Sequence, residues 1–500
     1  MVVESMKSLS SDHDSVHKKI VSSRYKYGIP KVDGAVIETK TVHVNSDKTS
    51  YAGDELAVLE LRSAGFCLDN QGSYIQFDVT GDGSSYLVNG PEDLIANVRV
   101  ISGSGACVQE VLHYDDICAM DQTWYEPRSN RAMVRLNNSA SGTDYAKNFG
   151  DMFAATGQAA KDAGNQTTYP SSEFCHPRAH VRGQTMTVDG GLEVPDPSAL
   201  PLPDVGQAAE DYKDTEASNV TCNRYIKLHA TVKRRFCFQL RNIGLLMSEK
   251  YLPLPWLGML RIEITFNKIS KCLQRASSTG NTFSITGLQY VGRLVKLNPT
   301  IMGDIGEAVA KDGLSIVFPT WHHSRSVTAG TSFTHRVFKN AFNAIRAVGS
   351  FREGALLTSE TGNSYYWVGN AILTLQGVIG TVRYPQCALQ TLEEMYVELL
   401  KAFDLYGEDR DRYEPRSMSW NQYAGKVAAL ASEATGRFAC AIDLRTTRGA
   451  GYNGVQTSGN NQLEFEITFG TDTGTGTFDC FLEHLVIMTV KQDLNVTTRF

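Results

Sequence analysis

The chain has 500 residues, with 48 Lys and Arg against 54 Asp and Glu, so its formal net charge is −6. Hydrophobic residues make up 42% and charged residues 20%, a globular composition that excludes a largely disordered protein. The weakly acidic total excludes a chain that wraps nucleic acid by bulk charge. At roughly 150 residues per domain the length suggests two to four domains.

The first 45 residues are polar, mixed in charge and without clear periodicity. They predict a slightly basic, flexible arm, which either orders against a partner or has no role. The extreme N-terminus has no apolar core and carries Asp12 and Asp14, so we do not expect a secretory signal. No apolar run in the chain approaches the roughly 20 residues that span a bilayer. We therefore expect synthesis in the cytosol and no membrane span.

The ten cysteines are scattered, without a C-x-x-C pair. Several of them, such as Cys237, Cys440 and Cys480, lie inside apolar runs. This predicts buried reduced thiols rather than a disulfide framework or a zinc site.

Beyond the arm, the dominant pattern is the alternation of apolar and polar residues. Residues 75–79 (IQFDV), 260–266 (LRIEITF) and 463–469 (LEFEITF) all show it. Such alternation predicts half-buried antiparallel strands. Turn-type clusters separate the strands, at residues 81–85, 277–281 and 471–477. The predicted class is therefore mainly β.

Two helices are predicted among the strands. The first extends from about Cys107 to Asp121. The second covers residues 389–403, where apolar residues recur at helical spacing, Thr391 and Glu394 can form a capping box, and Gly407 can end the helix.

Two segments of the chain repeat in the same order. Residues 235–240 (RFCFQL) precede LRIEITF as residues 437–444 (RFACAIDL) precede LEFEITF, at nearly equal spacing. Chance similarity of short strands is the alternative. The matched spacing and the preceding helices favour two similar β-domains in tandem, meeting near residues 298–312. The first repeat differs by a long insertion, about 95 residues at 125–220, and loops of that length are generally functional or form interfaces.

A search for chemistry finds no nucleophile elbow, Walker A loop or dinucleotide fingerprint. His322, His323 and His335 are poor metal ligands as a set, because neighbours in a strand point to opposite faces. The other candidates are explained without a functional site. The carboxylate pairs, Asp115 with Asp116 and Glu393 with Glu394, are expected on solvated helix faces. Cys118 with His113 and Cys175 with His176 are expected to hold core or surface thiols, and Lys233-Arg234-Arg235 is expected to be a solvated strand end.

Four glycosylation sequons are present, at Asn137, Asn165, Asn219 and Asn495, but their use is not expected without a signal peptide. We therefore predict no catalytic, cofactor-binding or metal-binding residue and no cofactor. A large repeated β-chain of this kind is a structural or binding protein.

Several ordered motifs resemble one family. Residues 243–266 (IGLLMSEKYLPLPWLGMLRIEITF) are similar to the G-L-L, K-x-L-P-L and strand segment of double-jelly-roll major capsid proteins, closest to those of polinton-like viruses and virophages. Residues 380–385 (GTVRYP) with the helix at 392–403 resemble a second motif of that group. Further matching segments are 45–61, 66–79, 438–444 and 454–469.

The resemblance implies two tandem eight-stranded antiparallel jelly rolls, each with a short helix and a long loop. It divides the chain into an arm (1–45), a first jelly roll with its insertion (46–300) and a second jelly roll (301–500).

It also implies a structural protein, not an enzyme. Three copies would form a pseudo-hexameric capsomer, and capsomers would tile an icosahedral shell around a double-stranded DNA genome. Its partners would be itself, neighbouring capsomers, and penton and minor capsid proteins in the virion capsid, without sequence-specific nucleic-acid binding. We expect the 125–220 loop to build outward towers and the arm to lie inside the shell.

Two alternatives belong to other classes. A lectin-like β-sandwich would stack sugars on exposed aromatic side chains, for which Trp124, Tyr125 and Trp321 are candidates. A β-sandwich hydrolase would need converging carboxylates, which the sequence does not identify.

Overall fold

The structure of the chain is a computed structural model. The described residues are 36–62, 65–82, 86–87, 90–121, 166–168, 185–188, 192–193, 226–228, 233–248, 250–274, 282–311, 313–353, 367, 372–403, 423, 438–445, 454–459, 461–470, 476–491 and 496–499. Most of the predicted arm (1–35) and most of the 125–220 insertion lie outside them. Within the insertion three short strands pair antiparallel: β8 (Gln166–Thr168), β9 (Thr185–Val188) and β10 (Leu192–Glu193).

The first half of the chain forms two antiparallel sheets, with strand orders β1-β15-β4-β12 and β3-β13-β6-β7. Numbered one to eight along the chain, these strands follow the orders 1-8-3-6 and 2-7-4-5, which is a jelly roll. Their bounds are β1 Val36–Asn45, β3 Leu56–Leu61, β4 Cys67–Gly81, β6 Ile95–Ser102, β7 Cys107–Leu112, β12 Arg234–Phe238, β13 Leu260–Phe266 and β15 Phe283–Leu297.

The second half repeats the same topology, with sheets β16-β24-β18-β21 and β17-β23-β19-β20. The repeated motifs occupy matching places, because RFCFQL and RFACAIDL overlap the sixth strands, and LRIEITF and LEFEITF are the seventh. The internal duplication is therefore confirmed. The bounds are β16 Leu314–Thr328, β17 Ser332–Val337, β18 Ala341–Glu353, β19 Ile372–Ile379, β20 Val382–Leu389, β21 Cys440–Asp443, β23 Leu463–Phe469 and β24 Gly476–Val490.

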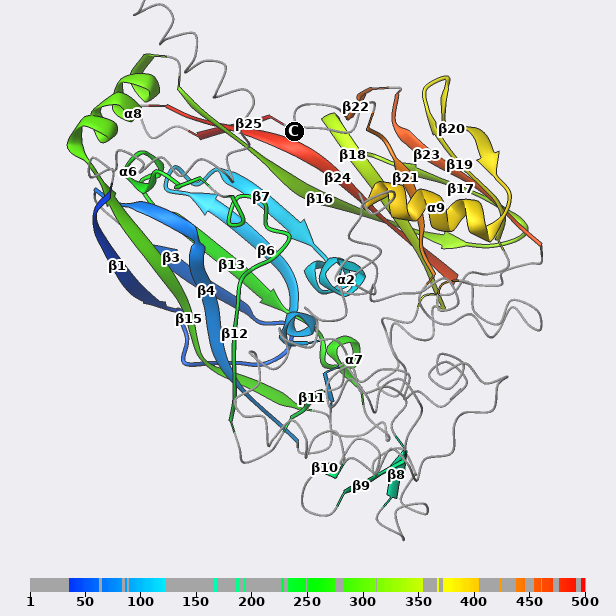
Figure 1. Ribbon diagram of the computed structural model, residues 1–500, viewed down its shortest axis with the longest axis horizontal. Helices are drawn as coiled ribbons and strands as arrows, with labels where there is room; N and C mark the ends of the chain where they lie inside the picture. Colours follow the sequence, from blue (N-terminus) through cyan, green and yellow to red (C-terminus); the bar gives the residue numbers. More distant parts are fainter. Residues whose placement is uncertain are drawn as a thin grey trace, which may run out of the picture.

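The two jelly rolls lie side by side along the longest axis of the molecule (Figure 1). Short strands extend the sheets or join loops: β2 Ser50–Tyr51, β5 Tyr86–Leu87, β11 Ile226–Lys227, β14 Leu273–Gln274, β22 Val455–Thr457 and β25 Val496–Arg499. The helices are η2 Pro91–Leu94, α2 Tyr114–Met120, α6 Leu254–Leu257, α7 Ile269–Cys272, α8 Pro299–Lys311 and α9 Leu392–Ala402. No helix among the described residues is long and apolar enough to cross a membrane.

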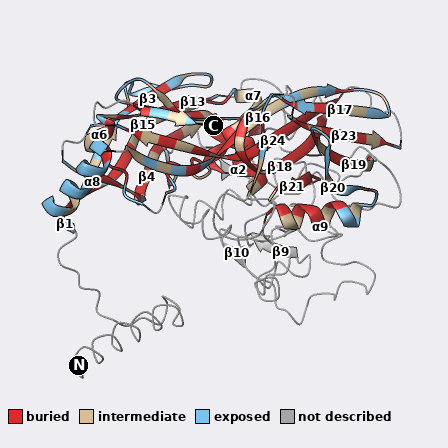
Figure 2. Cartoon of the chain, turned by 90° about the horizontal axis from the view of Figure 1, so that it is seen from above, coloured by how far each residue is buried: buried red, intermediate tan, exposed pale blue. Residues whose placement is uncertain are grey.

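The predicted alternation is confirmed by burial. Along β23 the odd-numbered residues Leu463, Phe465, Ile467 and Phe469 are buried, while Glu464 and Glu466 are not. In Figure 2 buried residues run through the strands of both halves, whereas β1 and α8 are largely exposed. Each pair of sheets therefore encloses an apolar core between its inner faces.

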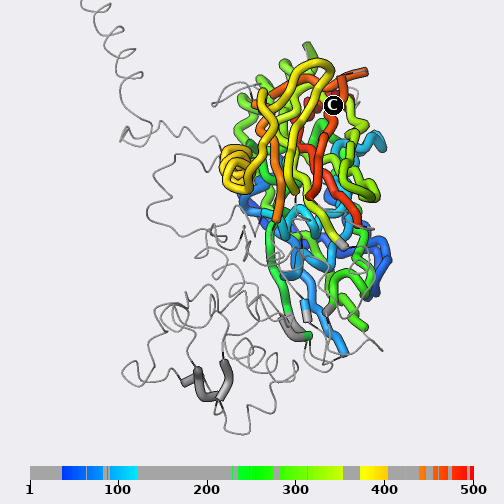
Figure 3. Tube along the Cα trace, turned by 90° about the vertical axis from the view of Figure 1, so that its right-hand side faces the viewer, coloured from blue at the N-terminus to red at the C-terminus, as the bar shows by residue number. Residues whose placement is uncertain are grey.

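The predicted second helix is confirmed as α9, which lies along one flank of the second jelly roll (Figure 3). Its capping box is present, since the Thr391 side chain accepts from the Glu394 amide and the Glu394 carboxylate accepts from the Thr391 amide. Gly407 lies outside the described residues. The predicted junction at 298–312 contains the linking helix α8.

Two sequence-based boundaries are wrong. Residues Cys107–Leu112 form strand β7, so the first helix begins only at Tyr114. Residues Val36–Asn45, assigned to the arm, form β1 against β15. Both errors have the same cause: an edge strand is exposed or covered unevenly, so its burial does not follow a strict period of two.

The cysteine prediction holds for Cys440 and Cys480, which are buried free thiols, while Cys237 is half-buried. None of the described cysteines is paired in a disulfide.

Candidate functional site

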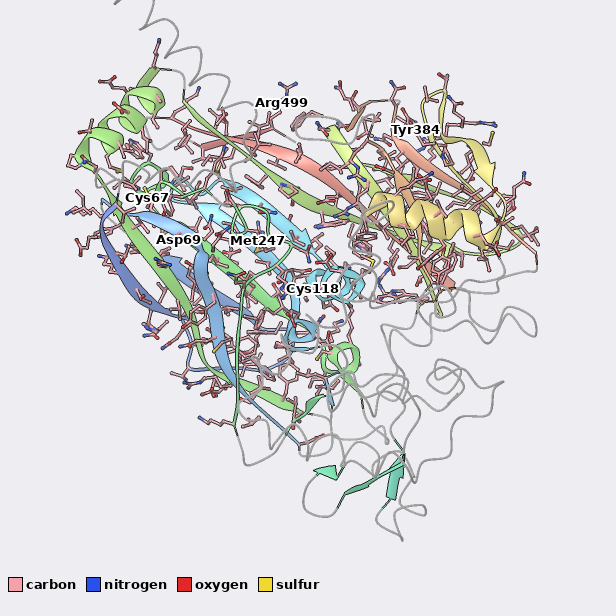
Figure 4. The ribbon with its side chains drawn as sticks, viewed as in Figure 1. Cys67, Asp69, Cys118, Met247, Tyr384 and Arg499 are labelled. Atoms are coloured by element: carbon pink, nitrogen blue, oxygen red, sulfur yellow. The ribbon has the colours of Figure 1, made fainter. Side chains whose placement is uncertain are left out.

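A cluster of fully buried charged side chains lies where the two jelly rolls meet. We call this contact the seam: β7, α2, α7 and the 239–248 loop of the first jelly roll against β16, β18 and β24 of the second. Figure 4 shows Cys118, on α2, between the two halves of the molecule.

Close backbone approach defines one part of the seam. The buried Gln109 side chain on β7 donates to the Pro319 carbonyl (3.2 Å) and to Thr320 Oγ1 (3.1 Å) on β16, and it accepts from the Leu245 amide (3.0 Å). A Cβ atom built on Gly244 would lie 2.0 Å from the Pro319 carbonyl oxygen. Only glycine therefore fits at position 244 without a backbone shift.

We expect Gly244→Ala to destabilise the chain by about 1–3 kcal/mol, because the added methyl forces the two backbones apart. The matched control is Gly303→Ala in α8, where nothing lies within 4 Å of the added Cβ. There alanine should be neutral or stabilise by up to about 1 kcal/mol through helix propensity. Thermal unfolding of both variants measures the difference, and equal melting temperatures would contradict the role of Gly244.

A fully buried arginine joins the two halves. Arg352, at the end of β18, donates through both terminal nitrogens to Asp116 on α2 (2.9 and 3.0 Å). It also donates to Asp479 Oδ2 on β24 (2.7 and 3.1 Å). Burial by itself would raise the pKa of Asp116, yet Arg352 and Lys271 hold it well below its usual range. Arg352 thus holds one carboxylate from each jelly roll.

A lysine completes the first jelly roll's side of the cluster. Lys271 Nζ on α7 lies 2.6 Å from Asp115 and 3.0 Å from Asp116. Burial raises the pKa of Asp115 despite this neighbour. Among the described residues, His113, Asp115 and Asp116 form the group whose ligand atoms are close enough to share a metal ion. Lys271 approaches all three, with His113 Nδ1 at 3.4 Å, so an ammonium group neutralises the carboxylates here.

Histidine and arginine complete the second jelly roll's side. His323 Nε2 lies 2.7 Å from Asp479 Oδ1, and Arg325 Nε donates to the same oxygen at 2.5 Å. The rings of His323 and His113 contact each other across the seam, with centroids 4.1 Å apart and planes tilted by 54°. Burial lowers the pKa of His323, although its contact with Asp479 opposes that shift. The cluster therefore pairs three cationic side chains (Lys271, Arg325 and Arg352) with three carboxylates (Asp115, Asp116 and Asp479). This balance of charge suits a structural contact between the two jelly rolls.

The candidate residues named from the sequence lie in different parts of the structure. The assignment of Asp115 and Asp116 to a solvated face is wrong, since both are buried, Asp115 against Lys271 and Asp116 against Lys271 and Arg352. Glu393 and Glu394 are exposed, as predicted. Cys118 is a buried thiol near Asn242, and Arg235 is an exposed strand residue paired with Asp78.

The histidines do not converge: His323 faces the seam, whereas His335 lies between Ser324 and Ser326. Trp321 is buried beneath Arg346 and offers no exposed stacking surface for a sugar. Several candidates lie outside the described residues, namely Trp124, Tyr125, Cys175, His176 and the four sequons at Asn137, Asn165, Asn219 and Asn495.

The sequence analysis missed Gln109, Arg352 and Asp479. A single signal was present for Asp479, which interrupts the otherwise apolar segment FDCFL. A lone carboxylate inside a buried strand requires a cationic partner. Nothing in the sequence identifies that partner as Arg352, more than a hundred residues earlier.

Comparison with known proteins gives the fold. No protein-family model matches the sequence, and the search of curated proteins finds no relative. The crystal structure of PBCV-1 VP54, fitted into a cryo-EM reconstruction of the virophage Sputnik, matches with a TM-score of 0.50 and 9% identity over 93% of this chain and 96% of that chain. The PBCV-1 virus capsid, a quasi-atomic model, matches with a TM-score of 0.51 and 8% identity over the same shares, 93% and 96%.

The mavirus major capsid protein matches with a TM-score of 0.47 and 12% identity, over 96% of this chain and 95% of that chain. The sequence identity to the two PBCV-1 structures is only 9% and 8%, so their similarity to this chain shows the fold alone, which is the double jelly roll. It agrees with the strand orders found in each half.

Proposed function

On the premise that this chain has the double-jelly-roll fold of viral capsid chains, we propose that it is a structural major capsid protein. Three copies form a pseudo-hexameric capsomer, and capsomers tile an icosahedral shell around a double-stranded DNA genome. The observation that supports this best is the repeat itself: two jelly rolls of identical strand order, joined by a buried seam. Three such chains supply six similar lobes with cyclic symmetry.

The other parts of the chain have separate roles in this capsid protein. The division at residue 300 separates a first jelly roll from a second. The 125–220 insertion builds the outward tower. The part of the arm that precedes β1, residues 1–35, lies inside the shell, where it contacts neighbouring capsomers, penton proteins or minor capsid proteins. The protein acts in the virion capsid after synthesis in the host cytosol.

We further propose that the chain is not an enzyme and binds neither a cofactor nor a metal. The seam supports this, because each of its carboxylates lies against a cationic side chain of the chain itself.

The test is the mass and shape of the purified protein. Light scattering should give three times 55.0 kDa, about 165 kDa, and electron microscopy should show three-fold particles with six lobes. A chain lacking residues 1–28 should still form the trimer but assemble shells poorly. A 55.0 kDa monomer under every condition would overturn the proposal, and normal shells from the shortened chain would remove the role of the arm.

A further inference from the structure

Two histidine rings meet inside the seam, one from each jelly roll. His113 lies between β7 and α2, and His323 lies on β16, with their ring centroids 4.1 Å apart. The two rings differ in their access to water, because the side chain of His113 is 32% exposed and that of His323 is 7% exposed. While the seam is closed, a proton from solvent therefore reaches His113 more readily than His323.

Charged and titratable groups from both jelly rolls surround the two rings. Those of the first jelly roll are Asp115 and Asp116 on α2 and Lys271 on α7. Those of the second are Arg325 on β16, His335 on β17, Arg352 on β18 and Asp479 on β24. Burial lowers the pKa of His335 to about 4, so this third imidazole stays uncharged in mild acid. With neutral histidines the three cations balance the three carboxylates, and each proton added to a ring leaves an excess of positive charge.

The closed seam resists the protonation of both rings. Once His113 is charged, a proton on His323 would bring two imidazolium rings into contact, and like charges repel more strongly in a mostly buried contact than in water. Asp479 offsets this only in part, because it already accepts from Arg325 and Arg352. Burial lowers the pKa of His323 and the neighbouring His113 lowers it further, although the contact with Asp479 opposes both.

An open seam removes this restriction. When β7 and α2 move away from β16, both imidazoles are hydrated and take up protons near their ordinary pKa of about 6.5. The open seam then binds about one more proton than the closed seam. Its population therefore rises as the pH falls below about 6.5, by at most about tenfold per pH unit.

We infer that the His113–His323 pair is an acid-sensitive latch, which holds the seam closed at neutral pH and lets it open locally in mild acid while both jelly rolls stay folded. The latch belongs to the single chain, so it can be tested whether or not the chain assembles. In the proposed capsid it would loosen each subunit on acidification.

The Thr320→Cys substitution provides a probe of the opening. Thr320 is buried in the seam, where Gln109 on β7 donates to its hydroxyl, so a thiol at this position becomes accessible when the seam opens. Cys440, a buried thiol on β21 outside the seam, is the internal control. Both thiols are labelled with a pyridyl disulfide and located by peptide mass spectrometry. Each rate is divided by the rate in the unfolded chain at the same pH.

The introduced thiol should label on the order of tenfold faster at pH 5 than at pH 7, because opening takes up about one proton. At both pH values it should label ahead of Cys440, which only more extensive unfolding exposes. Equal rates for the two thiols at pH 5 would mean that the chain unfolds as a whole, and this result would overturn the latch.

Three further variants, each combined with Thr320→Cys, identify the groups responsible. His323→Gln retains an amide nitrogen for Asp479 but cannot take up a proton, so it should abolish the acceleration by acid. His113→Asn removes the facing ring and should reduce the acceleration. His335→Asn alters a buried histidine outside the seam and should leave the acceleration unchanged.

Acceleration that persists in His323→Gln or is undiminished in His113→Asn would overturn the latch. The second variant keeps the test available if the first does not fold, because His113 is partly exposed and has a left-handed backbone (φ 54°), which asparagine tolerates. The oligomeric state is a separate measurement. Failure of the latch leaves the capsid proposal standing, whereas a permanent monomer overturns the capsid proposal alone.

Discussion

Replacing Arg352 by methionine should destabilise the folded chain by about 3–5 kcal/mol, because it leaves two carboxylates buried without their main cationic partner. Asp116 and Asp479 are 1% and 0% exposed, so water cannot take the place of the guanidinium. For units of jelly-roll size, this corresponds to a fall in melting temperature on the order of 10 °C. Differential scanning calorimetry at neutral pH measures it.

The control for this experiment is Arg336→Met. Arg336 pairs with Glu464 across β17 and β23, but its side chain is 54% exposed, so the loss should stay within about 1 kcal/mol. A rescue variant, in which Asp116 and Asp479 also become asparagine, should recover part of the stability because no charge remains buried alone. If Arg352→Met and Arg336→Met melt at the same temperature, the seam does not depend on its charge cluster.

Acid should destabilise the protein in two steps, starting with buried histidines. Burial lowers the pKa of His322, His335 and His484 to about 4, from a model-compound value of 6.5. The unfolded chain therefore takes up protons before the folded chain does, so stability falls as the pH drops from about 6.5 toward 4. Each histidine contributes on the order of 2–3 kcal/mol over that interval.

The second step involves carboxylates with lowered pKa. The Arg352 guanidinium offsets burial and holds the pKa values of Asp116 and Asp479 far below 3.8. These two carboxylates stabilise the folded chain at pH values above 3.8, the ordinary pKa of an aspartate in the unfolded chain. That stabilisation is lost as the pH falls further. Both steps lower the free energy of unfolding as the pH falls, so the melting temperature should decrease from pH 7 to pH 3.

One substitution isolates the histidine contribution. His335→Asn retains a polar group near Ser326 but cannot take up a proton, so it should reduce the fall in melting temperature between pH 7 and pH 5 by roughly a third. His43→Asn, at an exposed position on β1, should leave the profile unchanged. Identical profiles for the wild type and His335→Asn would contradict the assignment.

Local sequence determined the strands of this protein and their repetition. Alternation fixes which side chains of LRIEITF and LEFEITF face inward, because successive residues of a strand point to opposite faces. The capping box at Thr391 and Glu394 likewise fixes the start of α9 from neighbouring residues alone. The edge strands β1 and β7 were misassigned because an edge lacks the regular one-sided burial from which alternation arises.

The seam was decided by tertiary structure. Asp115 and Asp116 have the local pattern of a solvated helix face, yet both are buried. Arg352 on β18 of the second jelly roll binds Asp116, and Lys271 of the first jelly roll lies against both carboxylates. The burial and the pKa of Asp116 depend on Arg352, which is more than two hundred residues away in the sequence. No local sequence pattern predicts which of two such distant residues will meet. The sequence by itself therefore determined two similar β-domains, while the way they lock together followed from their packing in three dimensions.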